Sequence, residues 1–177
     1  MSQIFETIQS TIASKAGWFY ILAVNIILGF LIYLIFSRYG KIRIGGEDVK
    51  PEFTYWSWFS MLFSAGMGIG LVFYSVAEPI FHYISPPFGT GYSIDSAKLA
   101  MQFTFFHWGF HAWGIYAVVA LALAFFSYNR RLPLTIRSVF YPLLGEKIHS
   151  YIGNIIDITA TVATLFGLTT SLGLGVK

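Results

Sequence analysis

The sequence lacks cysteine altogether, and only 11% of its 177 residues are charged. Without cysteine there can be no disulfide, no thiolate metal site and no cysteine nucleophile. A soluble domain carries about 25% charged residues, and a globule of this size needs polar side chains over much of its surface. The shortage of charge therefore excludes a cytosolic enzyme, a disordered tail and a coiled coil. Hydrophobic residues make up 56% of the chain, and aromatic residues 19%.

Four long stretches carry almost no charge, and about 20 such residues suffice to cross a bilayer as a helix. They are residues 17–37, 53–83, 99–128 and 151–176. Glu78 and Asp157 are the only formal charges within them. The pattern predicts an all-α polytopic helical membrane protein, with a single membrane domain over residues 1–177 and four membrane spans.

Lys and Arg are concentrated in alternate connections between these stretches. Residues 38–52 and 129–150 hold eight of the 11 basic residues, whereas residues 84–97 hold none. The positive-inside rule places the first two connections in the cytoplasm, and residues 84–97 and the N-terminus outside. Apolar residues share one helical face within residues 1–16 and again within residues 136–148, so we expect a short interfacial helix in each.

The second stretch contains the sequence SAGMGIG at residues 64–70, with three glycines at alternate positions. In one interpretation Gly66 and Gly70 form a GxxxG pair that lets a neighbouring helix approach closely. In the other the helix unwinds here and exposes backbone groups near the midplane, as in many secondary transporters. A straight helix over residues 53–83 would be roughly 46 Å long, against an apolar core of about 30 Å. Spacing alone favours packing slightly.

The third stretch contains aromatic residues on one side of a helix. Trp108, Trp113 and Tyr116 fall within an arc of about 140° at 100° per residue. Their rings could form a cage for a quaternary ammonium group, because cation–π attraction needs no hydrogen-bond donor. The alternative is that these large rings fill the helix bundle or face lipid, and by pattern alone that alternative is the commoner one.

His107 and His111 lie four residues apart in the same stretch, which is a spacing that could hold a metal or a haem iron. The other histidines, His82 and His149, lie near opposite membrane ends, so hydrogen bonding in the core or at the interface is the competing interpretation. Two further functions therefore stay open: a haem- or metal-binding redox membrane protein, and a small membrane scaffold or subunit whose glycines and aromatics only pack helices.

Several of these stretches together resemble the betaine/carnitine/choline transporter (BCCT) family. They are residues 66–71 (GMGIGL), 77–79 (AEP), 106–117 (FHWGFHAWGIYA), 131–138 (RLPLTIRS) and 164–175. The resemblance implies a multi-pass protein of the plasma (inner) membrane with twelve helices, ten of them in two inverted repeats of the LeuT-like kind. This chain resembles only the second to fifth spans, so we expect a truncated transporter that does not transport alone.

The resemblance also implies secondary transport of a quaternary ammonium compound, coupled to sodium or proton influx. It implies substrate contacts on the unwound glycine stretch and the aromatic helix, at Ala65, Gly66, Met67, Gly68, Trp108, Trp113 and Tyr116. It implies sodium ligands at Ser64, Met67 and Thr164, although Leu168 stands where sodium-coupled relatives have a second threonine. The implied partners are glycine betaine, choline or carnitine, the lipid bilayer, and further copies of the chain, a trimer in some relatives. No enzymatic activity, cofactor or nucleic acid is expected.

Overall fold

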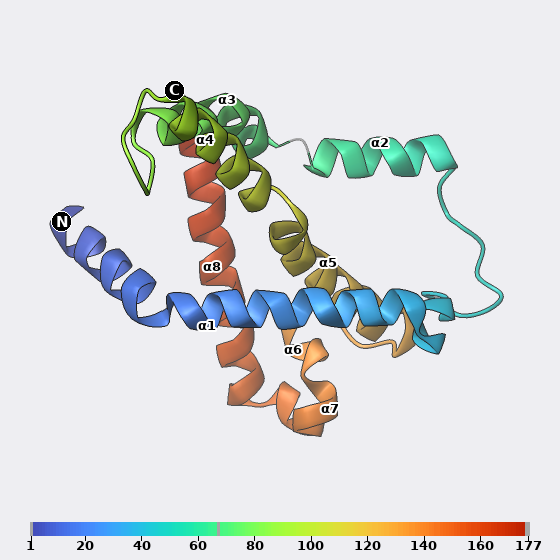
Figure 1. The fold of residues 1–177 in the computed structure, drawn as a ribbon. Helices are drawn as coiled ribbons and strands as arrows, with labels where there is room; N and C mark the ends of the chain where they lie inside the picture. The colour runs from blue at the N-terminus through green and yellow to red at the C-terminus, as the bar shows by residue number, and fades with distance from the viewer. Residues whose placement is uncertain (1, 67, 176–177) are drawn as a thin grey trace. The chain divides into compact units, whose positions relative to one another are not determined.

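The structure is a computed structural model that describes residues 2–66 and 68–175, and all regular structure within those residues is helical (Figure 1). The chain divides into two compact units. One contains residues 1–42 and 107–121, and the other contains residues 43–106 and 122–177. The sequence had predicted an all-α protein, and the helical content confirms it.

The first unit is built from α1 (Ser2–Phe36), a 3-10 turn η1 (Arg38–Lys41) and most of α5 (Phe110–Ala124). The expected short helix over residues 1–16 is the first part of α1, which continues without interruption into the first apolar stretch. Its first turns run at an angle to the rest (Figure 1). Continuity is reasonable because no proline lies in this part of the chain to break the hydrogen-bonding ladder.

The second unit contains the remaining helical elements. They are α2 (Tyr55–Gly66), α3 (Ile69–Ile84), α4 (Ile94–His107), the π-helix η2 (Phe125–Asn129), α6 (Ile136–Val139), α7 (Tyr141–Leu144), η3 (Gly145–His149) and α8 (Tyr151–Gly175). Three stretches among the described residues are long and apolar enough to cross a membrane: Glu6–Phe36, Ile94–Asn129 and Tyr151–Gly173. The pair α2 and α3, bent by 48°, passes the same test together and is either a broken fourth span or a re-entrant loop.

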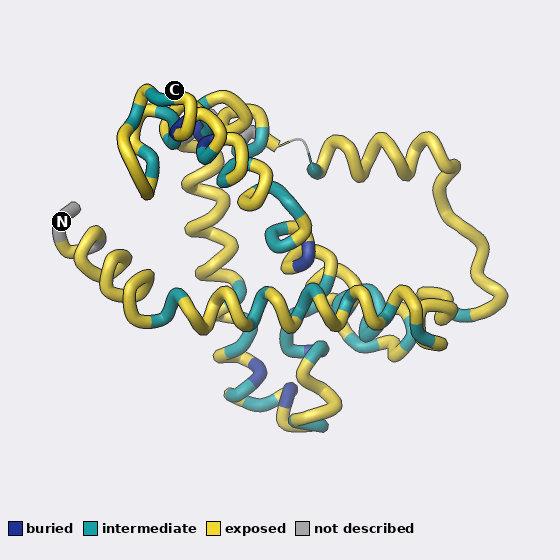
Figure 2. Tube along the Cα trace, in the orientation of Figure 1, coloured by how far each residue is buried: buried dark blue, intermediate teal, exposed yellow. Residues whose placement is uncertain are grey.

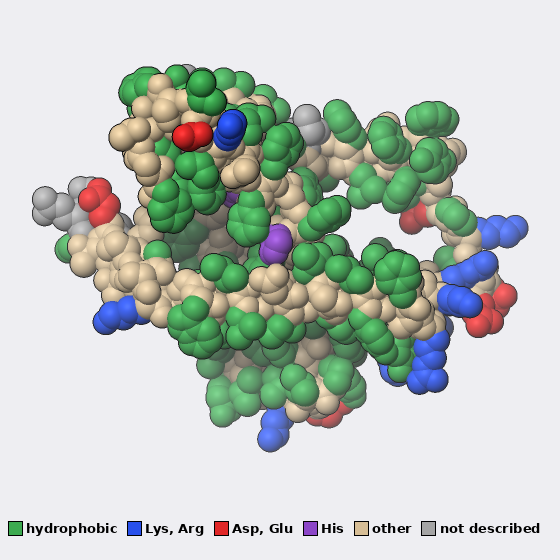
Figure 3. All heavy atoms as spheres, viewed as in Figure 1, with side chains coloured by type: hydrophobic (Ala, Val, Ile, Leu, Met, Phe, Trp, Pro, Cys, Tyr) green, Lys and Arg blue, Asp and Glu red, His purple; other side chains and the backbone are tan. Residues whose placement is uncertain are grey.

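Most apolar side chains of the described residues are exposed, as the yellow trace of Figure 2 shows. Hydrophobic side chains cover the helices in Figure 3, while Lys and Arg gather at the end of α1 and in the connection that follows. Such a surface would aggregate in water, but lipid tails are as apolar as the side chains that face them. The exposed apolar surface therefore fits a polytopic membrane protein.

The segment before α8 differs from the single short helix expected over residues 136–148. It forms three short helical pieces, α6, α7 and η3. Pro142 lies in the first turn of α7 and lacks the N–H that a continuous helix would need. Gly145 ends α7 with a φ of +53°, a backbone conformation that favours glycine. Below, residues 133–149 are called the docking segment.

Asn129 joins the end of the third stretch to the connection after α1. Its side-chain oxygen accepts a hydrogen bond from the N–H of Gly45 at 2.9 Å, and its side-chain nitrogen donates to the carbonyl of Arg43 at 2.9 Å. Gly45 has a φ of +90°, so a glycine is needed for this backbone to face the amide. The two connections rich in Lys and Arg are thus held together by one side chain.

Candidate functional site

The glycine stretch interrupts the second apolar stretch. The helix α2 ends at Gly66, and α3 begins at Ile69 after Gly68, which is extended with φ −72° and ψ 169°. The carbonyl of Gly68 accepts the first bond of α3, from the N–H of Val72 at 3.1 Å. Spacing alone favoured helix packing slightly; in the described residues one helix ends and the next begins here.

Two glycines of the stretch have open space beside them within the described residues. A Cβ built on Gly68 or on Gly70 would meet nothing within 4 Å. Of the substrate positions that the family resemblance implies, Ala65 and Gly68 are exposed, Gly66 is half-buried at the end of α2, and Met67 lies outside the described residues. The break therefore leaves short, accessible backbone on both of its sides.

A second break divides the third stretch at Trp108 and Gly109, between α4 and α5. The indole N–H of Trp113 donates to the carbonyl of Trp108 at 3.0 Å, and the backbone N–H of Trp113 donates to the carbonyl of Gly109 at 3.3 Å. A broken helix within a bilayer needs other donors for its carbonyl groups, because lipid supplies none. Trp113 supplies one such donor from its side chain.

Two of the three candidate cage residues lie side by side. The rings of Trp113 and Tyr116 have centroids 5.8 Å apart and planes tilted by 44°, and both side chains are exposed. The ring of Trp108 instead stacks on the imidazole of His107, with centroids 4.9 Å apart. Two tilted, accessible ring faces are an arrangement that attracts a cation without hydrogen-bond donors.

The two histidines four residues apart, His107 at the end of α4 and His111 on α5, contact different partners. The Nε2 atom of His111 lies 3.4 Å from the side-chain oxygen of Asn25 on α1, while His107 stacks on Trp108. Near the same place, a Cβ on the buried Gly114 would lie 3.7 Å from a methyl group of Leu31. Among residues 2–66 and 68–175 no group of three or more His, Asp or Glu is placed to hold a metal ion.

The contact between α1 and α5 was not predicted, although the sequence carried a signal for it. Asn25 was the one strongly polar residue inside the first apolar stretch. Polar side chains in membrane helices usually bond across to a neighbouring helix. The small residue Gly114 allows that neighbour to approach, and His111 supplies the polar partner.

The sodium candidates lie on different helices. Thr164 is on α8, where its hydroxyl donates to the carbonyl of Ala160 at 2.8 Å, and Ser64 is exposed on the last turns of α2. Within the described residues, Ser64 and Thr164 form no hydrogen bond with each other. A hydroxyl that donates to backbone keeps its oxygen lone pairs free for a hard cation.

Thr164 lines a groove of about 370 Å³ beside α8. The groove is bounded by Leu123, Leu134, Thr135, Ile136, Asp157, Ala160, Thr161, Thr164 and Leu165. Asp157, Thr161 and Thr164 follow one another at helical spacing, so they share one face of α8. This face carries oxygen atoms that are unusual for so apolar a helix.

Glu78 is a buried carboxylate near the end of α3, with 8% of its surface exposed. Its Oε1 atom lies 3.6 Å from Nε2 of His82, one turn later, and the His82 ring lies 5.4 Å from the ring of Phe103 on α4. The imidazole of His82 is thus close to both the carboxylate of Glu78 and the ring of Phe103.

The predicted substrate residues thus belong to two separate groups. Ala65, Gly66 and Gly68 lie in the unit of residues 43–106 and 122–177, whereas the aromatic residues lie in the other unit. Each group combines an interrupted helix with side chains or backbone that remain accessible. An interrupted membrane helix is how many secondary transporters expose backbone groups to a substrate or an ion.

A family model described as "BCCT, betaine/carnitine/choline family transporter" matches residues 1–177. The "Probable glycine betaine transporter" of Desulfitobacterium hafniense (strain Y51) is 50% identical over 175 residues, which is 99% of this chain and 35% of that protein. The "Glycine betaine transporter OpuD" of Bacillus subtilis (strain 168) is 50% identical over 176 residues, which is 99% of this chain and 34% of that protein.

A further relative carries a different substrate in its name. The "High-affinity choline transport protein" of Escherichia coli (strain K12) is 46% identical over 165 residues, which is 93% of this chain and 24% of that protein. The chain therefore spans about a quarter to a third of the length of the curated relatives it matches.

Proposed function

Because this chain belongs to the betaine/carnitine/choline transporter family, we propose that it forms part of a secondary transporter for a quaternary ammonium compound in the plasma membrane. The observation that carries the proposal is its 46–50% identity, over 93–99% of the chain, to proteins named glycine betaine and choline transporters. The proposed activity is transport rather than catalysis. Residues 1–177 would act within it as a single membrane domain.

The chemistry of the substrate class supports the two groups of candidate residues. A trimethylammonium group is a cation without a donor proton, so the faces of Trp113 and Tyr116 would bind it through cation–π attraction. The carboxylate of glycine betaine or carnitine needs donors. N–H groups at the start of α3 are donors of this kind, because the N-cap residue Gly68 has no side chain to occupy them.

Coupling of transport to an ion would use oxygen atoms on α2 and α8. We propose that the backbone near Ser64 and Met67 contributes to one site for the coupling sodium ion or proton, and that Thr164 contributes to another. The short oxygen-rich face of α8 supports this assignment, since hard cations prefer oxygen ligands. Further copies of the chain as partners stay a proposal, which cross-linking in membranes would test.

The decisive experiment transplants residues 1–177 into the matching region of the Bacillus subtilis relative. Uptake of radiolabelled glycine betaine and of choline is measured in cells without their own uptake systems, with sodium and proton gradients applied separately. We expect saturable, gradient-driven uptake of at least one compound. A chimera that reaches the membrane in normal amounts and transports neither would refute the proposal and favour a scaffold role.

Two substitutions in the same chimera test the aromatic pair. Trp113→Leu keeps apolar bulk and removes the ring face, so binding should weaken by about 1–2 kcal/mol, or roughly 5- to 30-fold. Tyr116→Phe keeps its ring face and serves as the matched control, with a much smaller loss. Equal affinities in all three proteins would leave Trp113 with a packing role alone.

A further inference from the structure

The docking segment is attached to α8 by one side chain, Arg137. Its backbone N–H donates to Oδ1 of Asp157 at 3.0 Å, and its Nε atom donates to the other oxygen of the same carboxylate. One terminal nitrogen donates to the side-chain oxygen of Asn154 at 3.0 Å, and the other donates to the carbonyl of Ile148 at 3.3 Å. Arg137 therefore ties α6 both to the end of η3 and to the first turns of α8.

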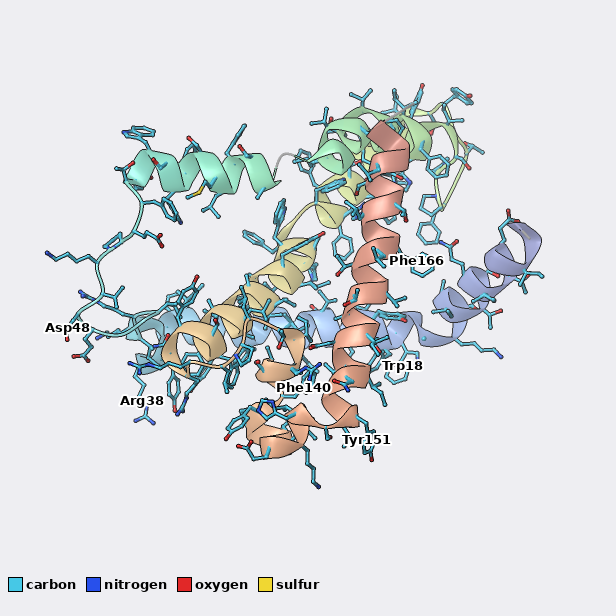
Figure 4. All side chains as sticks on the ribbon, turned by 180° about the vertical axis from the view of Figure 1, so that it is seen from behind. Trp18, Arg38, Asp48, Phe140, Tyr151 and Phe166 are labelled. Carbon is cyan, nitrogen blue, oxygen red and sulfur yellow. The ribbon has the colours of Figure 1, made fainter. Side chains whose placement is uncertain are left out.

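The packing around this contact is tight in a chain that is otherwise mostly exposed. Ile148 is 0% exposed and Ser138 is 1% exposed, and the hydroxyl of Ser138 donates to the carbonyl of Pro133 at 2.7 Å. The buried parts of the docking segment and of the start of α8 are dark blue in Figure 2. Figure 4 labels Phe140 and Tyr151 on the two elements that meet here.

Breaking the ion pair between Arg137 and Asp157 costs free energy. The side chains of Arg137 and Asp157 are each 23% exposed, so both charges are partly buried. Removing one partner of such a pair leaves the other charge unpaired in an apolar setting. Lysine would keep only part of this contact, because only the guanidinium offers several donors in a fixed plane to three acceptors at once.

The position of Arg137 connects this contact to the groove beside Thr164. Leu134, Thr135 and Ile136 form one wall of that groove, and Asp157 and the following turns of α8 form the other. Arg137 directly follows the first wall and bonds to the second. The ion pair therefore joins the two walls of the groove.

We propose that Arg137 is a positioning residue, a latch that holds the docking segment against α8 and controls how far the groove beside Thr164 opens to water. This proposal rests on the proposed function, because the opening would belong to the transport cycle. The latch would set the rate of that cycle. It would leave substrate affinity alone, since Arg137 lies outside the aromatic pair and the glycine stretch.

The test uses a single cysteine as a reporter of water in the groove. The chain has no cysteine, so Ala160→Cys, on the α8 wall, can be labelled selectively. A methanethiosulfonate reagent is added to both faces of membranes that contain the protein, because it reacts with the thiolate, which needs water. Leu143→Cys, at a position 82% exposed, is the reference for full reaction.

We expect the labelling rate of Ala160→Cys to rise by roughly tenfold in Arg137→Gln, since losing one partner of a partly buried pair favours the open arrangement. Arg137→Lys should lie between. Arg130→Gln is the matched control and should change nothing, because the Arg130 guanidinium lies over the Phe125 ring. Equal labelling in Arg137→Gln and in the parent protein overturns the latch. If Arg137→Gln does not reach the membrane, Asp157→Asn makes the same test with the same expectation.

Transport kinetics separate a positioning role from a purely structural one. In the chimera described above, Arg137→Gln should change the maximal uptake rate by at least about fivefold and leave KM within about twofold. A change in KM of the same size as the change in rate would overturn the proposal. Since labelling requires no transport, failure of the latch and failure of the proposed function give different results.

Discussion

Gly153→Ala is expected to destabilise the protein although alanine is the better helix former. Gly153 is buried in the first turn of α8, where the preceding chain turns back closely. A Cβ built there would lie 1.7 Å from the carbonyl oxygen of Ile148 and 2.6 Å from the carbonyl carbon. Both atoms belong to the backbone, so no change of rotamer relieves the contact. Either η3 or the start of α8 must move.

The size of the effect follows from two opposing contributions. Overpacking of this kind costs about 1–3 kcal/mol, whereas replacing glycine by alanine in a helix gains about 1 kcal/mol. Gly153→Ala should therefore lower the free energy of unfolding by up to about 2 kcal/mol. Gly167→Ala is the matched control on the same helix: a Cβ there meets nothing within 4 Å, so it should gain up to about 1 kcal/mol.

The comparison of the two variants isolates the contact with Ile148, because the helix-propensity gain is common to both. Their free energies of unfolding should differ by about 1–3 kcal/mol. The measurement is a titration of the purified protein in mixed micelles with increasing SDS, followed by helical circular dichroism. Equal midpoints for Gly153→Ala and Gly167→Ala would show that the close approach of η3 to α8 does not exist in the membrane protein.

Three further outcomes are expected. Trp113→Phe keeps a ring but loses the N–H that donates to the Trp108 carbonyl, so the same titration should show a loss of about 0.5–1.5 kcal/mol; Tyr116→Phe should show none. An impermeant thiol reagent added to intact cells should label Phe88→Cys and not Leu143→Cys, following the positive-inside rule, and the reverse would invert the proposed topology. The 177-residue chain expressed alone should insert into membranes without accumulating glycine betaine, because alternating access needs two repeats that move against each other; accumulation in proteoliposomes would contradict this.

The glycine stretch shows what a pattern leaves undecided. The same three glycines serve close helix packing or an interrupted helix, and spacing alone could not separate the two. In the structure α2 ends at Gly66 and α3 begins at Ile69. In the third stretch the sequence did not single out Trp108 and Gly109 as the position of a break. At this break the indole N–H of Trp113 donates a hydrogen bond to the carbonyl of Trp108, five residues earlier.

The sequence by itself determined the class of the protein: apolar runs of span length, alternate basic connections and the family motifs each depend on local composition, which is visible in the chain. Only the tertiary structure decided which polar residues meet. Asn25 and His111 are 86 residues apart, and Arg137 and Asp157 are 20 apart. Many polar side chains in an apolar chain could satisfy one another, and the choice is made by which backbones approach. Those approaches are set where side chains are small or absent, at Gly114 and Gly153.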